Sequence, residues 1–214
     1  MTLTADVYFS YRSPYSYLAT PRYLQLTRDW DLTISLKTVY PIAIRDPGFF
    51  EREHPSWISY LQRDILRVAQ FNDMPLVPPS PDPIVQNMKT REIAADQPYI
   101  RAISFLGVEA ERCGAGLAFA AEVTAMIWGG VKDWHLDGPM GEAADRCGLD
   151  LSDMQSAIGD GADHEAEIIA NQDALEAAGH WGVPTLVYEG EPFFGQDRIE
   201  LALWRMKQNG LQQR

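Results

Sequence analysis

The stretch FSYRSPYSYL, residues 9–18, joins the end of an alternating apolar run to the start of a helical pattern. Ser13 is a favourable N-cap and Pro14 suits the first helical position, so we expect a helix over residues 14–29. With cysteine at positions 13 and 16, the stretch would read C-P-Y-C, the spacing of a dithiol redox site. This chain carries hydroxyls there instead. The helix N-terminus and the Ser13 hydroxyl both favour an anion at this point.

Strand-like patterns flank this helix and return at the other end of the chain. Residues 3–9 and 31–39 read as strands, which with the helix between them predict a parallel crossover unit. Residues 183–194, VPTLVYEGEPFF, read as a hairpin that turns at Glu189-Gly190-Glu191. Helical patterns precede and follow that hairpin at residues 163–178 and 197–208. The two ends together predict one α/β sheet.

The middle of the chain predicts helices only. Apolar side chains recur at helical spacing in residues 55–71, and Asp-Pro or Asp-x-Pro starts precede several further helical patterns. Those helices are expected at residues 83–94, 97–112, 116–128 and 138–147, with one more capped by Ser152. The fold class we expect is α/β, a sheet domain of residues 1–45 plus 163–214 with an all-helical insertion of residues 46–162. A pocket between the two parts is the expected site.

Composition and charge exclude several classes of partner. The 214 residues carry a net charge of -12 and no basic stretch, which argues against nucleic acid and anionic membranes as partners. No apolar run approaches the roughly 18 residues that cross a bilayer. The N-terminus has no basic start and places Asp6 where a signal peptide would be apolar, so we expect a cytoplasmic protein. The four histidines show no paired metal spacing, and no metal site is expected.

Two further stretches carry polar groups that a ligand could use. In Gly182-Val183-Pro184-Thr185, a cis Val183–Pro184 bond would turn the backbone amide and carbonyl of Val183 outward, where an extended peptide could pair with them. An edge-strand proline is the alternative for that stretch. In Gly195-Gln196-Asp197-Arg198, Asp197 is a candidate N-cap whose carboxylate could also accept hydrogen bonds from an ammonium group.

A helix start of this kind and a Val-Pro-Thr stretch before a strand are the two motifs that together form a thioredoxin-like active site. With them in place, the sequence resembles the 2-hydroxychromene-2-carboxylate isomerase family, which belongs with kappa-class glutathione transferases and the DsbA-related disulfide oxidoreductases. The resemblance rests on three segments: DVYFSYRSPYSYLA, QRDILRVAQFNDMPL and WGVPTLVYEGEPFFGQDRIELALW. The last of these is the most specific. The fold implied is thioredoxin-like.

The resemblance implies glutathione as the cofactor, which would explain why the chain needs no cysteine at the helix start. Ser13 would donate a hydrogen bond to the glutathione sulfur and be the catalytic residue. Val183, beside Pro184, would pair with the backbone of the tripeptide. Asp197, with Gln196 next to it, would hold the γ-glutamyl ammonium, and Trp181 would line the same end of the site.

The reaction implied is cis–trans isomerisation of an aromatic unsaturated keto acid, as in the catabolism of aromatic compounds. The family pattern leads us to expect a lysine and an asparagine after the second strand. Residues 39–57, VYPIAIRDPGFFEREHPSW, contain neither, so we take Tyr15, Arg45 and His54 as the candidate contacts to this small-molecule substrate. Family members commonly form homodimers, so a second copy of the chain is the protein partner implied.

Two other functions stay open from the sequence. The same site could conjugate glutathione to an electrophile, as a kappa-type transferase does. In a different class, the chain could be a non-catalytic module that holds extended peptides at the Val183–Pro184 edge. Glutathione affinity separates this module from the two enzymes.

Overall fold

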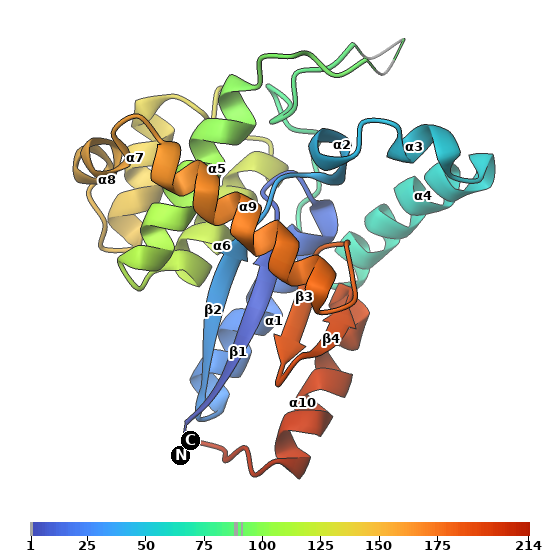
Figure 1. Ribbon diagram of the computed structural model, residues 1–214, viewed down its shortest axis with the longest axis vertical. Helices are drawn as coiled ribbons and strands as arrows, with labels where there is room; N and C mark the ends of the chain where they lie inside the picture. The colour runs from blue at the N-terminus through green and yellow to red at the C-terminus, as the bar shows by residue number, and fades with distance from the viewer. Residues whose placement is uncertain (1, 88–89, 91) are drawn as a thin grey trace.

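The computed structural model describes residues 2–87, 90 and 92–214, and within them a four-stranded sheet runs through the molecule (Figure 1). The strand order is β2-β1-β3-β4. β1 (Leu3–Phe9) pairs in parallel with β2 (Leu32–Thr38) and antiparallel with β3 (Thr185–Tyr188), which forms a hairpin with β4 (Glu191–Phe194). Both ends of the chain therefore build one sheet, and the predicted α/β, thioredoxin-like fold class is confirmed.

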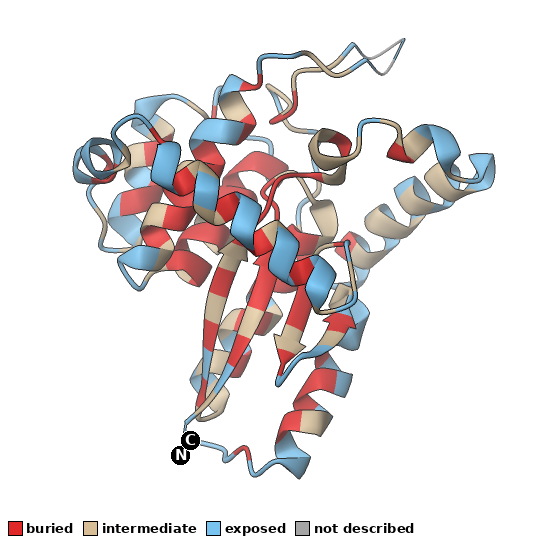
Figure 2. Cartoon of the chain, viewed as in Figure 1, coloured by how far each residue is buried: buried red, intermediate tan, exposed pale blue. Residues whose placement is uncertain are grey.

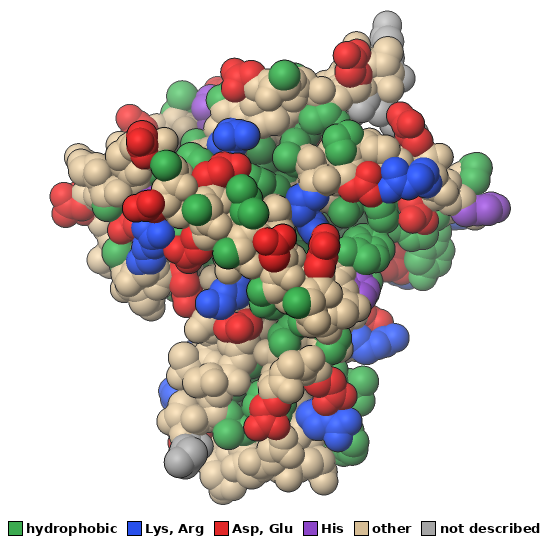
Figure 3. All heavy atoms as spheres, in the orientation of Figure 1, with side chains coloured by type: hydrophobic (Ala, Val, Ile, Leu, Met, Phe, Trp, Pro, Cys, Tyr) green, Lys and Arg blue, Asp and Glu red, His purple; other side chains and the backbone are tan. Residues whose placement is uncertain are grey.

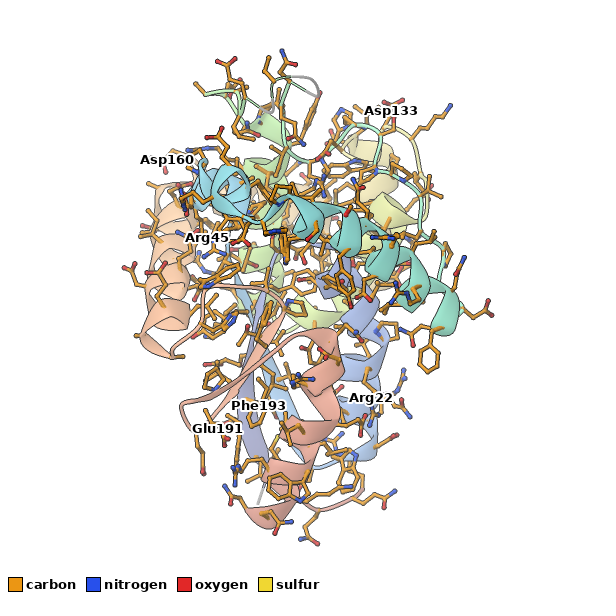
Figure 4. The ribbon with its side chains drawn as sticks, turned by 90° about the vertical axis from the view of Figure 1, so that its right-hand side faces the viewer. Arg22, Arg45, Asp133, Asp160, Glu191 and Phe193 are labelled. Carbon is orange, nitrogen blue, oxygen red and sulfur yellow. The ribbon has the colours of Figure 1, made fainter. Side chains whose placement is uncertain are left out.

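Helices cover both faces of this sheet. α9 (Ala162–Ala177) crosses one face, and α1 (Pro14–Asp29) and α10 (Ile199–Gln208) lie on the other (Figures 1 and 4). Successive side chains of β1 point to opposite faces of the sheet. Tyr8 packs with Leu175 of α9 on one face, whereas Val7 and Phe9 belong to the main hydrophobic core on the other. Figure 2 shows buried residues along β1, β2 and β3 between these layers, whereas the edge strand β4 has Phe193 as its one buried residue.

The middle of the chain forms a helical block beside the sheet, with α6 against α1 and α5 against β2. α4 extends away from the body, and its buried residue is Ala69 (Figures 1 and 2). In the part of the chain that the structure describes, no helix has the length and apolar character to cross a bilayer. The helices of this region are α4 (Pro55–Phe71), α5 (Pro98–Arg112), α6 (Gly116–Trp128), α7 (Asp137–Arg146) and α8 (Leu151–Ile158).

The helix expected at residues 83–94 is wrong for the residues described there, and positions 88, 89 and 91 lie outside the described residues. The chain is extended instead, with an antiparallel bridge between Gln86 and Ile93. The Asp82 carboxylate that was expected to cap a helix accepts the amide of Ile84 at 2.9 Å and two hydrogen bonds from Arg12 at 2.5 and 2.8 Å. An Asx-type turn thus replaces the cap.

Three smaller differences concern helix starts. Two short helices that the sequence did not predict, α2 (Ile42–Arg45) and α3 (Phe49–Arg52), follow β2. α8 is capped by Asp150, whose side chain accepts the amide of Asp153, and not by Ser152. Asp197 is not an N-cap, because it lies inside the 3₁₀ turn η1 (Gln196–Arg198) that precedes α10.

Tyr11 locks the loop after β1 against the helical block. Its side chain is fully buried and packs edge-on to Phe119 of α6. A Cβ added to Gly107 of α5 would lie 2.4 Å from the Tyr11 hydroxyl oxygen. Only glycine leaves room for this ring, so the loop that carries Ser13 is held at a fixed distance from α5.

We expect Gly107→Ala to lower the free energy of unfolding by up to about 2 kcal/mol, because overpacking costs about 1–3 kcal/mol and the gain in helix propensity offsets about 1. Urea unfolding measures this change. Gly138→Ala is the matched control, since an added Cβ in α7 meets open space. Equal stability of the two variants would contradict the packing described.

Candidate active site

Four chain segments meet at one edge of the sheet. β1 and β2 run in parallel, so the loop that begins at Ser10 and the segment that begins at Val39 leave from the same edge. β3 is antiparallel to β1 and therefore begins there, just after Pro184. β4 is antiparallel to β3 and ends there, just before Gly195. The three motifs found in the sequence are thus brought together by strand pairing.

Ser13 presents its hydroxyl at this edge. It is the N-cap of α1: its Oγ accepts the Ser16 amide at 3.2 Å and donates to the Val183 carbonyl oxygen at 3.4 Å. Pro14 has no N–H and the Tyr17 amide bonds to the Ser13 carbonyl, so the Tyr15 amide is the open donor of the first turn within the described chain. Ser16 is fully buried. Of the two serines, Ser13 is the one that can reach a ligand.

The backbone before β3 has one side satisfied and one side open. The Val183–Pro184 bond is cis, which is one of the two alternatives that the sequence left open. The Gly182 amide donates to His180 Nδ1 at 2.8 Å, the Gly182 carbonyl accepts from Thr185 Oγ1 at 2.7 Å, and the Pro184 carbonyl accepts from the Gly195 amide at 2.8 Å. Among the described residues, none accepts a hydrogen bond from the Val183 amide. That amide is available to a ligand.

Asp197 lies on η1, which contacts α1, and its carboxylate is exposed. It pairs with the guanidinium of its neighbour Arg198 at 2.6 Å. The pKa of the Tyr15 phenol is raised mainly by burial and by Asp64. The negative charge of Asp197 makes a smaller contribution in the same direction. The site edge therefore carries a carboxylate and a guanidinium side by side, close to the start of α1.

Trp181 belongs to an aromatic cluster that the sequence did not predict as a unit. Its ring lies 4.8 Å from that of Phe49 in α3 and stacks on His180, which in turn stacks on Phe194 of β4 with ring centroids 4.0 Å apart. Figure 3 shows hydrophobic side chains gathered on the face below α2 and α3. No local signal could have revealed this cluster, because Phe49 lies more than a hundred positions from His180, Trp181 and Phe194.

The three substrate contacts expected from the sequence are not brought together. Tyr15 donates to Asp64 of α4 at 2.6 Å, and burial, followed by that hydrogen bond, raises its pKa, so the phenol stays protonated. Arg45 donates to the carbonyl oxygens of Tyr40 and Trp181 at 2.8 and 2.7 Å. His54 caps α4, ten residues before Asp64 and therefore about 15 Å further along the helix.

A pocket of about 520 Å³ is lined mostly by residues of the middle of the chain, with Tyr40 and Ile44 from the part before it. Its walls come from the segment Tyr40–Glu51 on one side and Glu92–Arg101 on the other. None of Ser13, Val183 and Asp197 lines it. Among the described residues, no group of three or more His, Cys, Asp or Glu side chains could hold a metal ion.

His180 gives the site edge a dependence on pH. Burial lowers its pKa from the ordinary value of 6.5, and its Nδ1 must be unprotonated to accept the Gly182 amide. An unfolded chain therefore takes up the proton more readily than the folded one. The stability due to neutral His180 is fully present above about pH 6.5 and is lost as the pH falls below it.

We expect the wild type to lose more thermal stability than His180→Phe between about pH 8 and about pH 5, because phenylalanine keeps the ring stack but cannot be protonated. Melting temperatures measured across this range test the difference. Parallel pH profiles for the two proteins would show that His180 has no such role.

Comparison with known proteins supports the fold. A 2-hydroxychromene-2-carboxylate isomerase of Pseudomonas putida is 28% identical over 201 residues, 92% of this chain and 91% of the relative, which confirms the resemblance seen in the sequence. A solved 2-hydroxychromene-2-carboxylate isomerase superposes with a TM-score of 0.70 at 23% identity, covering 96% of this chain and 95% of that one. The cytosolic disulfide reductase DsbM of Pseudomonas aeruginosa, solved with GSH, superposes with a TM-score of 0.61 at 16% identity, covering 97% and 100%. A family model described as the DSBA-like thioredoxin domain matches residues 4–206, and the chain belongs to this family.

Proposed function

We propose that this protein is a glutathione-dependent cis–trans isomerase of an aromatic unsaturated keto acid. The observation that carries the proposal is the approach of Ser13 Oγ to the Val183 carbonyl at 3.4 Å, beside a Val183 amide left open. A hydroxyl thus stands where a redox relative would have a thiol, next to backbone that can pair with a peptide. The isomerase names of the relatives and the GSH in the DsbM structure support this choice.

The local groups are sufficient to ionise a bound thiol. A free thiol has a pKa of about 8.5, and lowering it by about two units requires roughly 2.7 kcal/mol of preferential thiolate stabilisation. A hydrogen bond to a charged group contributes about 1.5–3 kcal/mol and a helix N-terminus about 0.3–1. Ser13 supplies the hydrogen bond to the charged sulfur, and the start of α1, with its open Tyr15 amide, supplies the helix N-terminus. Neither a metal ion nor a histidine is needed for this step.

The remaining groups at the edge suit the rest of the tripeptide. The open amide of Val183 can pair with the cysteinyl backbone as an added strand, and its carbonyl can do so once the Ser13 hydroxyl turns from it to the sulfur. The γ-glutamyl end carries an ammonium and a carboxylate, and it can meet Asp197 and Arg198 together. Gln196 adds an amide beside them, and the exposed Trp181 forms the wall next to Val183.

When bound, glutathione supplies a thiolate that adds reversibly to a conjugated carbon, so that the former double bond can rotate before the thiolate leaves. The residues of the chain bind the tripeptide, orient its sulfur and keep it ionised. Tyr15, Arg45 and His54 all have partners within the fold, so we assign none of them as the donor that stabilises the enolate.

A kappa-type transferase is the second candidate, and the same partners of Tyr15, Arg45 and His54 favour it. Conjugation to an electrophile uses the bound thiolate but needs no separate donor to an enolate. Net loss of free thiol during turnover of a conjugated keto acid indicates the transferase, whereas geometric isomerisation at constant thiol indicates the isomerase. A reducing, cytoplasmic setting and a homodimer are part of the proposal.

We expect Ser13→Ala to raise the pKa of the bound glutathione thiol by about 1–2 units, the equivalent of about 1.5–3 kcal/mol for a lost hydrogen bond to a charged group. The measurement is a pH titration of thiolate absorbance at saturating glutathione. Ser13→Thr is the control, since it keeps both the hydroxyl and the helix cap. A thiolate pKa that is the same in all three proteins would refute the role of Ser13.

We expect Asp197→Asn to weaken glutathione binding by about tenfold, as befits about 1.4 kcal/mol for one lost charge-assisted contact. Calorimetric titration with glutathione measures this. The matched probe is N-acetylglutathione, which lacks the ammonium and should bind the variant and the wild type alike. If the variant discriminates between the two peptides as strongly as the wild type does, Asp197 does not recognise the ammonium.

A further inference from the structure

Arg45 joins two segments that meet at the candidate active site. It is the last residue of α2, and its Nε donates to the Tyr40 carbonyl at 2.8 Å while its Nη2 donates to the Trp181 carbonyl at 2.7 Å. Figure 4 shows the side chain beside α9, beneath the short helices that follow β2. Because two donors of one rigid, planar guanidinium are used, the distance between the two carbonyls is fixed.

One end of this link is firmly held. The Tyr40 amide donates to Gln172 Oε1 at 3.2 Å, and the Tyr40 hydroxyl donates to Glu165 Oε2 at 2.5 Å. Gln172 and Glu165 both lie on α9, the helix that covers one face of the sheet. Tyr40 is therefore an anchored point from which Arg45 reaches across to the other segment.

The other end lies two residues before Val183. Between them, Gly182 is fixed through its amide by His180 and through its carbonyl by Thr185. The carbonyls of residues 181–184 are thus all engaged, while the amides of Trp181 and Val183 donate to no acceptor in the described chain. Besides the Ser13 hydroxyl on Val183 and the Phe49 ring against Trp181, Arg45 supplies a third long-range contact of this segment, and it is the one that links it to Tyr40.

We propose that Arg45 is a positioning residue that holds the Val183 backbone ready to pair with a bound peptide. This inference rests on the proposed glutathione site and assigns Arg45 a role there in place of the substrate contact expected from the sequence. An extended peptide pairs with a backbone amide only if that amide already points outward, and ordering it at the time of binding lowers the affinity. Thiol ionisation depends on Ser13 and the start of α1, which Arg45 does not contact.

The test compares Arg45→Met, Arg45→Lys and the control Arg146→Met. Arg146 is also the last residue of a helix and bonds to Glu122 at 2.7 Å. With no second substrate present, Arg45→Met should weaken glutathione binding by about tenfold, as expected for a lost positioning contact. Arg45→Lys should rescue the affinity only in part, since an ammonium lacks the fixed fork of donors. Arg146→Met should bind as the wild type does.

Two further readouts separate positioning from general stability. At saturating glutathione, Arg45→Met should show the wild-type thiolate pKa. Without ligand, hydrogen exchange should become faster in the peptide that contains residues 180–184 and stay unchanged in β1. Unchanged affinity in Arg45→Met, a shifted thiolate pKa, or faster exchange throughout the sheet would overturn the proposal.

The same experiment distinguishes this inference from the proposed function. If the wild type does not bind glutathione, the proposed function fails, and exchange in the ligand-free proteins then decides the role of Arg45 alone. Faster exchange confined to residues 180–184 supports the positioning role, and wild-type exchange there excludes it.

Discussion

The pairing of β1 with β2 on one side and with β3 on the other is the constraint on which the site depends. Parallel pairing sends the chain after β1 and after β2 to one edge, and antiparallel pairing brings the start of β3 to the same place. The Ser13 hydroxyl and the Val183 carbonyl meet at 3.4 Å although 170 positions separate them. The helical block and the link through Arg45 then fix the segments that the strands have brought together.

The chemistry of this edge follows from what the two serines can and cannot do. Ser16 lies in the first turn of the helix that Ser13 caps and is fully buried. Ser13 alone offers a donor toward a ligand, beside the open amides of Tyr15 and Val183. These neutral donors favour a negatively charged atom without supplying a charge of their own, and this suits a thiolate that must both form and leave.

Local patterns predicted most of the fold, because strands, caps and helix starts depend on neighbouring residues. The strands at both ends, α1 with its Ser13 cap, and the Val183–Pro184 turn could be read in this way. The extended segment around Gln86 and Ile93 could not, because Asp82 is engaged by Arg12 from the other part of the chain. The contact of Tyr15 with Asp64 and that of Arg45 with Trp181 were missed for the same reason: the partners are 49 and 136 positions away, and no local rule selects them.

Serine at positions 13 and 16 also means that this site cannot respond to the redox state of its surroundings by forming a disulfide. A dithiol pair in this place gains and loses electrons, so its state follows the ratio of oxidised to reduced partners. Two hydroxyls cannot store electrons, and the two cysteines of the chain, Cys113 and Cys147, are free. If the site binds glutathione as proposed, its occupancy is governed by mass action, that is, by how much reduced tripeptide is present, and a change in redox potential leaves the two serines unaltered.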